Sequence, residues 1–175
     1  MSLLNRFRGL LEGFLIVVSL LLMAVLAIIV IAAVAFRYSG ASFTWYDEVA
    51  SIVLAWLTYY GAALAALRRA HLGFPNLVAL LPPALRLVAL LISEAVVFVF
   101  FIVMAKFGYE AIILLHGDAL VSLPWVKVEV VMSVIPIGAV LFILAELTTL
   151  PEKVREAWYG MPPAEIEHLT EVTEP

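Results

Sequence analysis

The chain has 175 residues, of which 65% are hydrophobic and 14% are charged, and its formal net charge is −4. A soluble domain is about half apolar and about a quarter charged, so a water-soluble fold of this size would expose too much apolar surface. Cysteine is absent, which excludes disulfides, thiolate chemistry and Cys-ligated metals. There is no basic stripe, so we do not expect nucleic-acid binding. Composition therefore predicts an integral membrane protein.

Four apolar runs follow one another, and each is long enough for a membrane-spanning helix. The first, from Gly13 to Phe36, contains only one polar side chain, that of Ser19, and would extend about 36 Å as a helix. A signal peptide is the alternative for this run, but its hydrophobic part reaches only about 15 residues, so we favour a retained helix. We predict a four-helix transmembrane domain at 1–150, with spans at about 10–36, 47–67, 84–106 and 125–147, and a partly disordered acidic cytoplasmic tail at 151–175.

Basic residues are unevenly divided between the two sides of these spans. Cytoplasmic segments of membrane proteins are enriched in Lys and Arg. The amino terminus, the second connection and the tail hold Arg6, Arg8, Arg68, Arg69, Arg86, Lys153 and Arg155, whereas the first and third connections hold Arg37, Lys106 and Lys127. The chain is therefore predicted to have both termini in the cytoplasm, giving an N-in/C-in topology.

The second connection is itself apolar in part, and Pro75 is suited to the start of a short helix. One interpretation is a short interfacial helix between helices 2 and 3, lying along the membrane surface. A loop packed on the helix bundle explains the same pattern equally well.

Glu94 is the one ionisable residue deep in a span, and such a residue is by default a functional candidate. It could carry a proton or cation, or it could be hydrogen-bonded to a neighbouring helix or a partner subunit. Because a transport pathway usually needs several polar groups, broken helices or repeats, we favour the structural role. The histidines lie outside the spans, and there is no Ser-His-Asp spacing or phosphate loop, so neither an enzyme nor a cofactor is expected.

Two further patterns concern helix packing. Gly61 and Ala65 are four residues apart on the second span, and small residues at this spacing let helices approach closely. Whether the neighbour is internal or another protein stays open. At the outer boundary, Arg37 ends the first helix and Glu48 begins the second, so each suits its own helix dipole. The two side chains could also form an ion pair.

Several short motifs follow one another along the chain in an order that resembles a known family. They are Phe36-Arg37-Tyr38, Trp45-Tyr46-Asp47-Glu48, Trp56, Gly61-Ala62-Ala63, Ala70-His71-Leu72, Leu81-Pro82-Pro83 and Ile135-Pro136-Ile137-Gly138. Together with the four-span plan, this order resembles the small membrane subunit (DctQ-like) of tripartite ATP-independent periplasmic (TRAP) transporters. The resemblance covers about Leu10 to Leu150, and Glu94 is not part of the family's pattern.

The resemblance implies a role in a three-part transporter of the bacterial inner membrane. A periplasmic solute-binding protein captures a small, usually carboxylate-bearing solute. A large TRAP membrane subunit, an elevator-type permease, then moves this solute together with sodium. The small subunit packs on the large one as a scaffold and binds no substrate, so its expected partners are these two proteins and membrane lipids. The alternative functions are an autonomous small transporter or channel that uses Glu94 as its ion or proton site, and, more remotely, a membrane-bound enzyme or quinone-reactive anchor.

These patterns together give a set of candidate structural or subunit-interface residues. They are Arg37, Trp45, Glu48, Trp56, Gly61, Ala65, His71, Glu94 and Pro136.

Overall fold

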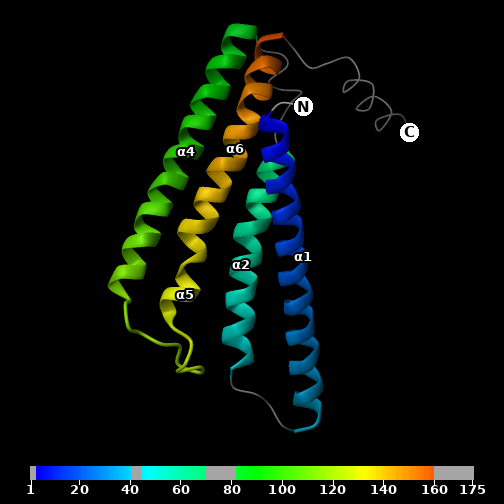
Figure 1. Ribbon diagram of the computed structural model, residues 1–175, viewed down its shortest axis with the longest axis vertical. Coiled ribbons are helices and arrows are strands. Elements are labelled where there is room, and N and C mark those ends of the chain that lie inside the picture. Colours follow the sequence, from blue (N-terminus) through cyan, green and yellow to red (C-terminus); the bar gives the residue numbers. More distant parts are fainter. Residues whose placement is uncertain (1–2, 41–44, 70–81, 160–175) are drawn as a thin grey trace, which may run out of the picture.

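The computed structural model describes residues 3–40, 45–69 and 82–159, and its regular structure there is helical. The helices are α1 (Leu3–Tyr38), α2 (Tyr46–Leu67), α4 (Pro83–Leu114), α5 (Val128–Met132) and α6 (Val134–Tyr159) (Figure 1). Four helical stretches are long and apolar enough to cross a membrane: α1, α2, α4, and α5 with α6. This confirms the predicted all-α, four-span fold. The possible interfacial helix and His71 lie outside the described residues.

The third span is longer than predicted. We expected it to end near residue 106, but α4 continues to Leu114 because nothing in the intervening residues breaks a helix except the single Gly108. The helix ends shortly before Gly117, whose φ of 93° is favourable only for glycine. Lys106, which we had assigned to a connection, is therefore part of the helix.

The fourth span also differs from the prediction at both of its ends. It starts with the short helix α5, and a break at Ser133 separates α5 from α6. Pro136 lies in the first turn of α6, where the N–H that proline lacks is least needed. At the other end, α6 continues past Pro151 to Tyr159. The expected tail is therefore helical over residues 151–159, and the rest of it lies outside the described residues.

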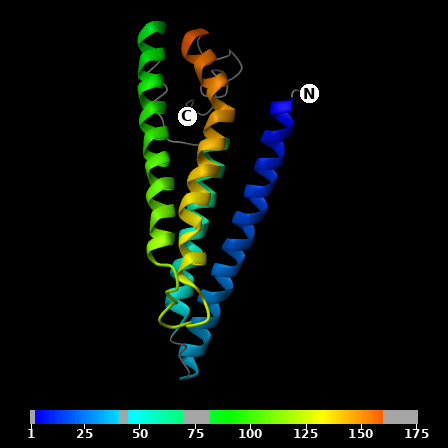
Figure 2. The same cartoon turned by 60° about the vertical axis from the view of Figure 1, so that its left-hand side comes forward.

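The four spans form an open row instead of a closed bundle. The helix α4 packs against α6, α6 packs against α2, and α2 packs against α1, whereas α1 and α6 touch only sparsely. Figure 1 shows this order, and Figure 2 shows that α1 is inclined to the other helices. The core lies along α6 and α2, and it includes Leu15, Tyr60, Leu67 and Phe142.

Two glycines allow the closest approaches between helices in this row. A Cβ atom on Gly138 of α6 would lie 2.7 Å from the Cβ of Tyr59 on α2, and one on Gly108 of α4 would lie 2.6 Å from Cγ2 of Ile135. About one helical turn beyond Gly138 along α6, the rings of Phe101 and Phe142 stack with their centroids 3.7 Å apart. These contacts fix how α4, α6 and α2 are aligned along their lengths.

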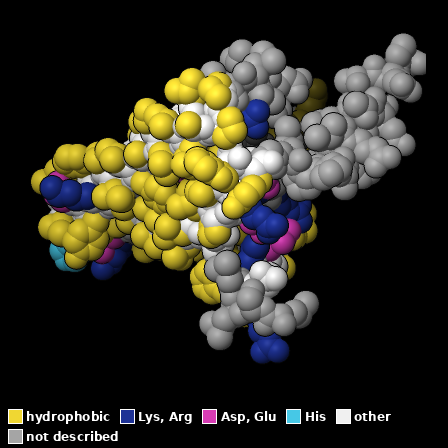
Figure 3. Space-filling model, turned by 90° about the horizontal axis from the view of Figure 1, so that it is seen from above, with side chains coloured by type: hydrophobic (Ala, Val, Ile, Leu, Met, Phe, Trp, Pro, Cys, Tyr) yellow, Lys and Arg dark blue, Asp and Glu magenta, His cyan; other side chains and the backbone are white. Residues whose placement is uncertain are grey.

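Because the row is open, each span buries little of its own surface. Each span has a most apolar window of 18 residues. The buried share of that window is 28% in the fourth span, 17% in α2, and 6% in each of α1 and α4. Hydrophobic side chains accordingly cover much of the surface seen in Figure 3. In a membrane, this surface is available to lipid or to another membrane protein.

Candidate functional site

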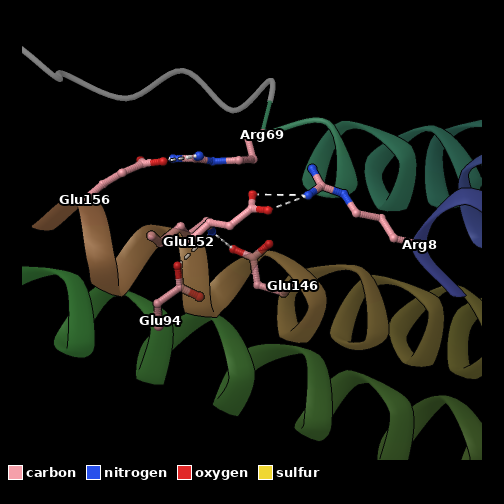
Figure 4. A network of polar contacts seen from close by, with 7 residues as sticks. Arg8, Arg69, Glu94, Glu146, Glu152 and Glu156 are labelled. Atoms are coloured by element: carbon pink, nitrogen blue, oxygen red, sulfur yellow. Dashed lines mark hydrogen bonds and ion pairs between the residues drawn. The ribbon is translucent and has the colours of Figure 1, made fainter. Parts of the chain in front are cut away.

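Most charged side chains of the described residues gather at the two ends of the row. We call the end at which α1 begins and α6 finishes the Arg8 end, and the end at which α1 finishes and α2 begins the Trp45 end. At the Arg8 end, the guanidinium of Arg8 lies 3.0 Å from Oε1 of Glu152 on α6, and it also donates to the carbonyl oxygen of Leu67, 3.2 Å away, at the last turn of α2. One side chain of α1 therefore contacts two other helices, and Figure 4 shows its contact with Glu152.

Two further arginines, both just after α2, extend this network. Arg68 lies 2.8 Å from a carboxylate oxygen of Glu12 on α1, and Arg69 forms a two-pronged ion pair with Glu156 on α6. Arg69 has a φ of 57°, a left-handed conformation that glycine usually takes after a helix. These pairs fasten the end of α2 to helices on both sides of it.

Glu94 lies in the buried part of the same end. Its Oε1 is 2.8 Å from Nζ of Lys153 on α6, and the same ammonium also pairs with Glu146. Glu94 is 6% exposed and Glu146 is 3% exposed, so the two acidic side chains are enclosed. We name Glu94, Glu146 and Lys153 the buried triad. As expected for the structural role, Glu94 has a hydrogen-bond partner on a neighbouring helix.

The chemistry available to the buried triad is limited. Its two acidic side chains share one basic side chain, and Oε2 of each carboxylate has no hydrogen-bond partner among the described residues. No group of three or more potential metal ligands occurs in the described part of the chain. Attraction between Lys153 and the carboxylates offsets part of the cost of placing them in a medium of low dielectric constant. The arrangement is suited to holding α4 against α6.

The predicted ion pair between Arg37 and Glu48 at the Trp45 end is wrong. Arg37 donates a hydrogen bond to the hydroxyl of Tyr46, and its guanidinium lies 5.8 Å from the centre of that ring. Glu48 accepts hydrogen bonds from the backbone N–H of Ser122, at 3.0 Å, and from its hydroxyl. The prediction failed because the connection between α4 and α5 folds back over α2, which brings Ser122 to Glu48.

This connection is internally ordered by hydrogen bonds. Ala119 and Lys127 form an isolated antiparallel bridge, and the N–H of Leu120 donates to the carbonyl of Val126 at 3.0 Å. Glu129 of α5 accepts a hydrogen bond from the N–H of Gly117 at 2.9 Å. Glu48 therefore fastens an already folded connection to α2.

The two candidate tryptophans lie at different depths. Trp56, in the middle of α2, donates from Nε1 to the carbonyl oxygen of Val131 in α5 at 3.2 Å. That carbonyl is next to the break at Ser133, so Trp56 satisfies a polar group where the helix is interrupted. Trp45 precedes α2 and is partly buried. Both residues thus have structural positions.

The small residues singled out on α2 do not make the close contacts of the row. A Cβ on Gly61 would meet nothing within 4 Å, and Ala65 is only partly buried. The tight contacts are instead at Gly108 and Gly138, of which only Gly138 belongs to a motif quoted from the sequence. Pro136 contributes to the contact at Gly108, where its Cδ would lie 3.2 Å from an added Cβ.

Sequence reasoning missed several residues of these clusters. Lys153 fell in the predicted acidic tail, Glu146 fell at the end of the predicted fourth span without being singled out, and Ser122 carried no signal. A helical projection of residues 134–159 would have placed Glu146 and Lys153 on one face, since they are two turns apart. No comparable pattern could have linked Ser122 to Glu48.

The comparisons with known proteins agree with this architecture. The family described as "Tripartite ATP-independent periplasmic transporters, DctQ component" matches residues 26–156, which is more than two thirds of the chain. A comparison with curated proteins found no match. The matched range includes all of α2, α4, α5 and most of α6, together with the buried triad. The chain therefore belongs to the DctQ family, the small membrane component of TRAP transporters.

Proposed function

We propose that the chain is the non-catalytic scaffold subunit of a sodium-coupled TRAP transporter that imports a small carboxylate-bearing solute. It packs on the large membrane subunit in the bacterial inner membrane, and a periplasmic solute-binding protein delivers the solute. Membership of the family supports the assignment to a TRAP transporter. Sodium coupling and the class of solute are what the resemblance to that family implies. The basic side chains at the Arg8 end support a cytoplasmic location for that end.

The observation that carries the scaffold role is the open row of helices. A row in which α1 and α4 bury almost none of their apolar windows has a large surface left for another membrane protein. The exposed face of α2 favours such a partner, because beside Leu54 it includes Ser51, Thr58 and the partly buried Gly61 and Ala65. Small and weakly polar residues are typical of contacts between membrane helices.

The alternative of an autonomous transporter or channel depends on Glu94 being free to bind an ion. In the structure, Lys153 contacts Glu94 and the side chain is enclosed between α4 and α6. The shallow hollow lined by Phe107, Ala111 and Leu114 lies near the other end of α4 and does not reach Glu94. These observations favour the scaffold role.

Co-purification tests the proposal. An affinity tag on this chain should retain a large TRAP membrane subunit from the same genome when both are expressed together and extracted in mild detergent. A matched preparation with the tag on an unrelated four-helix membrane protein controls for aggregation. If the large subunit is never retained, although both proteins are folded in the membrane, the scaffold proposal is wrong.

A further inference from the structure

An exposed ion pair on α4 lies at the depth of the apolar segments of its neighbours. The ammonium of Lys106 is 3.8 Å from a carboxylate oxygen of Glu110, one turn later, and their side chains are 69% and 51% exposed. On α1, by contrast, no charged residue occurs between Gly13 and Phe36. Charged side chains that face lipid in the middle of a bilayer are costly and rare.

The depth of this pair follows from the contacts of α4. Gly108, between the two charged residues, packs on Ile135 near the start of α6. Two residues before Lys106, the sulfur of Met104 lies 3.9 Å from the hydroxyl of Tyr59. Lys106 is thus about 3 Å along the helix axis from a residue that contacts Tyr59.

Tyr59 in turn marks the middle of α2. The uncharged part of that helix runs from Val49, near the Trp45 end, to Leu67, at the Arg8 end. Tyr59 therefore lies about 15 Å from Val49 and about 12 Å from Leu67 along the helix axis. Glu110 is four residues further along α4 than Lys106, about 6 Å towards the Trp45 end. Both charges therefore lie within the thickness that α2 defines for the hydrocarbon layer.

Tilting the whole row relative to the membrane does not move Lys106 and Glu110 out of this layer while α2 stays within it. The stacked rings of Phe101 and Phe142 and the contact of Gly108 with Ile135 align α4 with α6 in one register. In the same register, the ammonium of Lys153 reaches Glu94, so the apolar residues before Glu94 run beside the charged last turns of α6. The apolar segment of α4 is thus displaced towards the Arg8 end relative to α6 and α2.

The face of α4 that carries the pair also has a regular spacing. Among the many exposed residues of α4, one stripe opposite α6 has alternating intervals of four and three, and its members are mostly β-branched: Ile92, Val96, Val99, Val103, Lys106 and Glu110. We name them the α4 seam. A repeat of 3.5 residues is the pattern by which helices pack side by side with a small crossing angle. The seam points away from α6, because the contacts with α6 come from residues such as Glu94, Phe101 and Gly108.

We propose that the α4 seam is the surface on which a transmembrane helix of the large subunit packs, with polar groups of that helix facing Lys106 and Glu110. The proposal rests on the proposed function, since it names the face used in that assembly. Charge at this depth and a packing repeat on the same stripe distinguish a protein partner from lipid. The other uncovered helix, α1, has an uncharged exposed surface between Gly13 and Phe36 that suits lipid.

Spin labels can test which faces are covered, because the chain has no cysteine of its own. Val99→Cys places a label on the seam, and Leu21→Cys places one on α1 at nearly equal exposure, 62% against 60%. Each labelled chain is reconstituted in lipid nanodiscs, alone and co-assembled with the large subunit. We measure label mobility and accessibility to oxygen, which reports lipid, and to a nickel chelate, which reports water.

We expect the Val99 label to be accessible to oxygen in the chain alone and to become immobile and inaccessible to both reagents on assembly. The Leu21 label should stay accessible to oxygen in both preparations. The proposal is overturned if the Val99 label remains as accessible to oxygen as the Leu21 label in the complex. It is also overturned if nickel reaches it, indicating an aqueous path, or if it is already immobile alone, indicating self-association. Failure of the unlabelled chain to bind the large subunit would instead refute the proposed function.

The ion pair itself can be tested by removing both charges together. In the double variant Lys106→Leu with Glu110→Leu, neither member of the pair is left as a single charge without its partner. Because polar contacts between membrane helices contribute about 0.6–2 kcal/mol, we expect the affinity for the large subunit to fall about three- to thirtyfold. The isolated variant should be as abundant and as thermally stable as the unsubstituted chain. Undiminished affinity would contradict a partner at Lys106 and Glu110.

Discussion

Lys153 is the residue on which the two enclosed acids at the Arg8 end depend. Its ammonium is the basic group that contacts both Glu94 and Glu146. Because its side chain leaves α6 at the membrane boundary and extends back towards the helix N-terminus, it reaches groups that lie deeper than its own Cα atom. The contact between α4 and α6 at this end therefore relies on one flexible side chain.

Replacing Lys153 by Met should strongly destabilise the chain. The substitution keeps the volume but leaves both enclosed acids without a basic partner, a loss of about 3–5 kcal/mol for a buried ion pair. Arg155→Met, which removes an exposed positive charge two residues away, should change stability by less than about 0.5 kcal/mol. Thermal unfolding followed by circular dichroism in detergent measures both. Equal unfolding temperatures for the two variants would show that the buried triad does not stabilise the fold.

Glu48 should couple energetically to Ser122 and not to Arg37. In a double-mutant cycle of Glu48→Ala and Ser122→Ala, we expect an interaction free energy of about 0.5–3 kcal/mol, because a hydrogen bond to a charged group is lost. In the cycle of Glu48→Ala and Arg37→Ala, the effects should add. Unfolding free energies in detergent supply all the values. Coupling to Arg37 alone would restore the ion pair predicted from the sequence.

Residue-level reasoning from the sequence found Glu94 but could not find its partner. Glu94 is conspicuous because it interrupts an apolar run. Lys153 is 59 positions further along the chain and lies beyond the predicted last span, which ended near residue 147 with the apolar run. Pairing across such a separation depends on the register of α4 against α6, which packing determines and local sequence does not.

At the scale of helices, two glycines set the spacing of the row. Gly138 lets α6 approach Tyr59 on α2, and Gly108 lets α4 approach Ile135. Each contact brings a helix backbone near a large side chain, a device typical of membrane helices. The small residues predicted to do this on α2, Gly61 and Ala65, are available for other contacts.

Alanine at Gly138 and at Gly61 should have opposite effects on stability. An added Cβ at Gly138 would meet the Cβ of Tyr59 at 2.7 Å, so the helices must separate, at a cost of about 1–3 kcal/mol. At Gly61 the Cβ meets nothing within 4 Å, and alanine should stabilise α2 by up to about 1 kcal/mol through its higher helix propensity. The unfolding free energy of each isolated variant, compared with that of the unsubstituted chain, measures both effects. Destabilisation of the isolated chain by Gly61→Ala would contradict the described packing.

The existence of the helices could be predicted better than their ends. Long apolar runs identify spans because the bilayer has a fixed thickness. The ends of α4 and α6 were misplaced because the predicted spans stopped where the apolar runs stop, whereas both helices continue through charged residues such as Lys106 and Lys153. The helix is interrupted at Ser133 because Pro136 has no N–H to donate to the carbonyl group one turn earlier. The position of the proline makes such a break possible, but the sequence alone does not show that it occurs.

At the scale of the whole molecule, the open row explains why this chain is expected to act in an assembly. Nothing in the four apolar runs distinguishes a row from a closed bundle, because most of the surface of α1 and of the apolar part of α4 is suited to lipid as well as to other helices. The order of helices is instead fixed by Gly108, Gly138 and the ion pairs at the Arg8 end. Such contacts depend on three-dimensional register and could not be deduced from composition.

The predicted topology can be tested with single cysteines. Ser39 and Ala119 are exposed at the Trp45 end, and Thr170 lies beyond the described residues. In intact cells, an impermeant thiol reagent should label Ser39→Cys and Ala119→Cys and spare Thr170→Cys, because the basic residues favour the cytoplasm for the Arg8 end. After permeabilisation, all three should react. Labelling of position 170 in intact cells would overturn the N-in/C-in assignment.

The central claim is that this chain supports transport without carrying the solute or ion itself. The most direct measurement is solute uptake into proteoliposomes under a sodium gradient, with each of the three components omitted in turn. We predict uptake only when this chain, the large subunit and the solute-binding protein are all present, and we predict that Glu94→Gln retains most of it once assembled. Uptake or ion flux by this chain alone, abolished by Glu94→Gln, would contradict the account and establish Glu94 as an ion site.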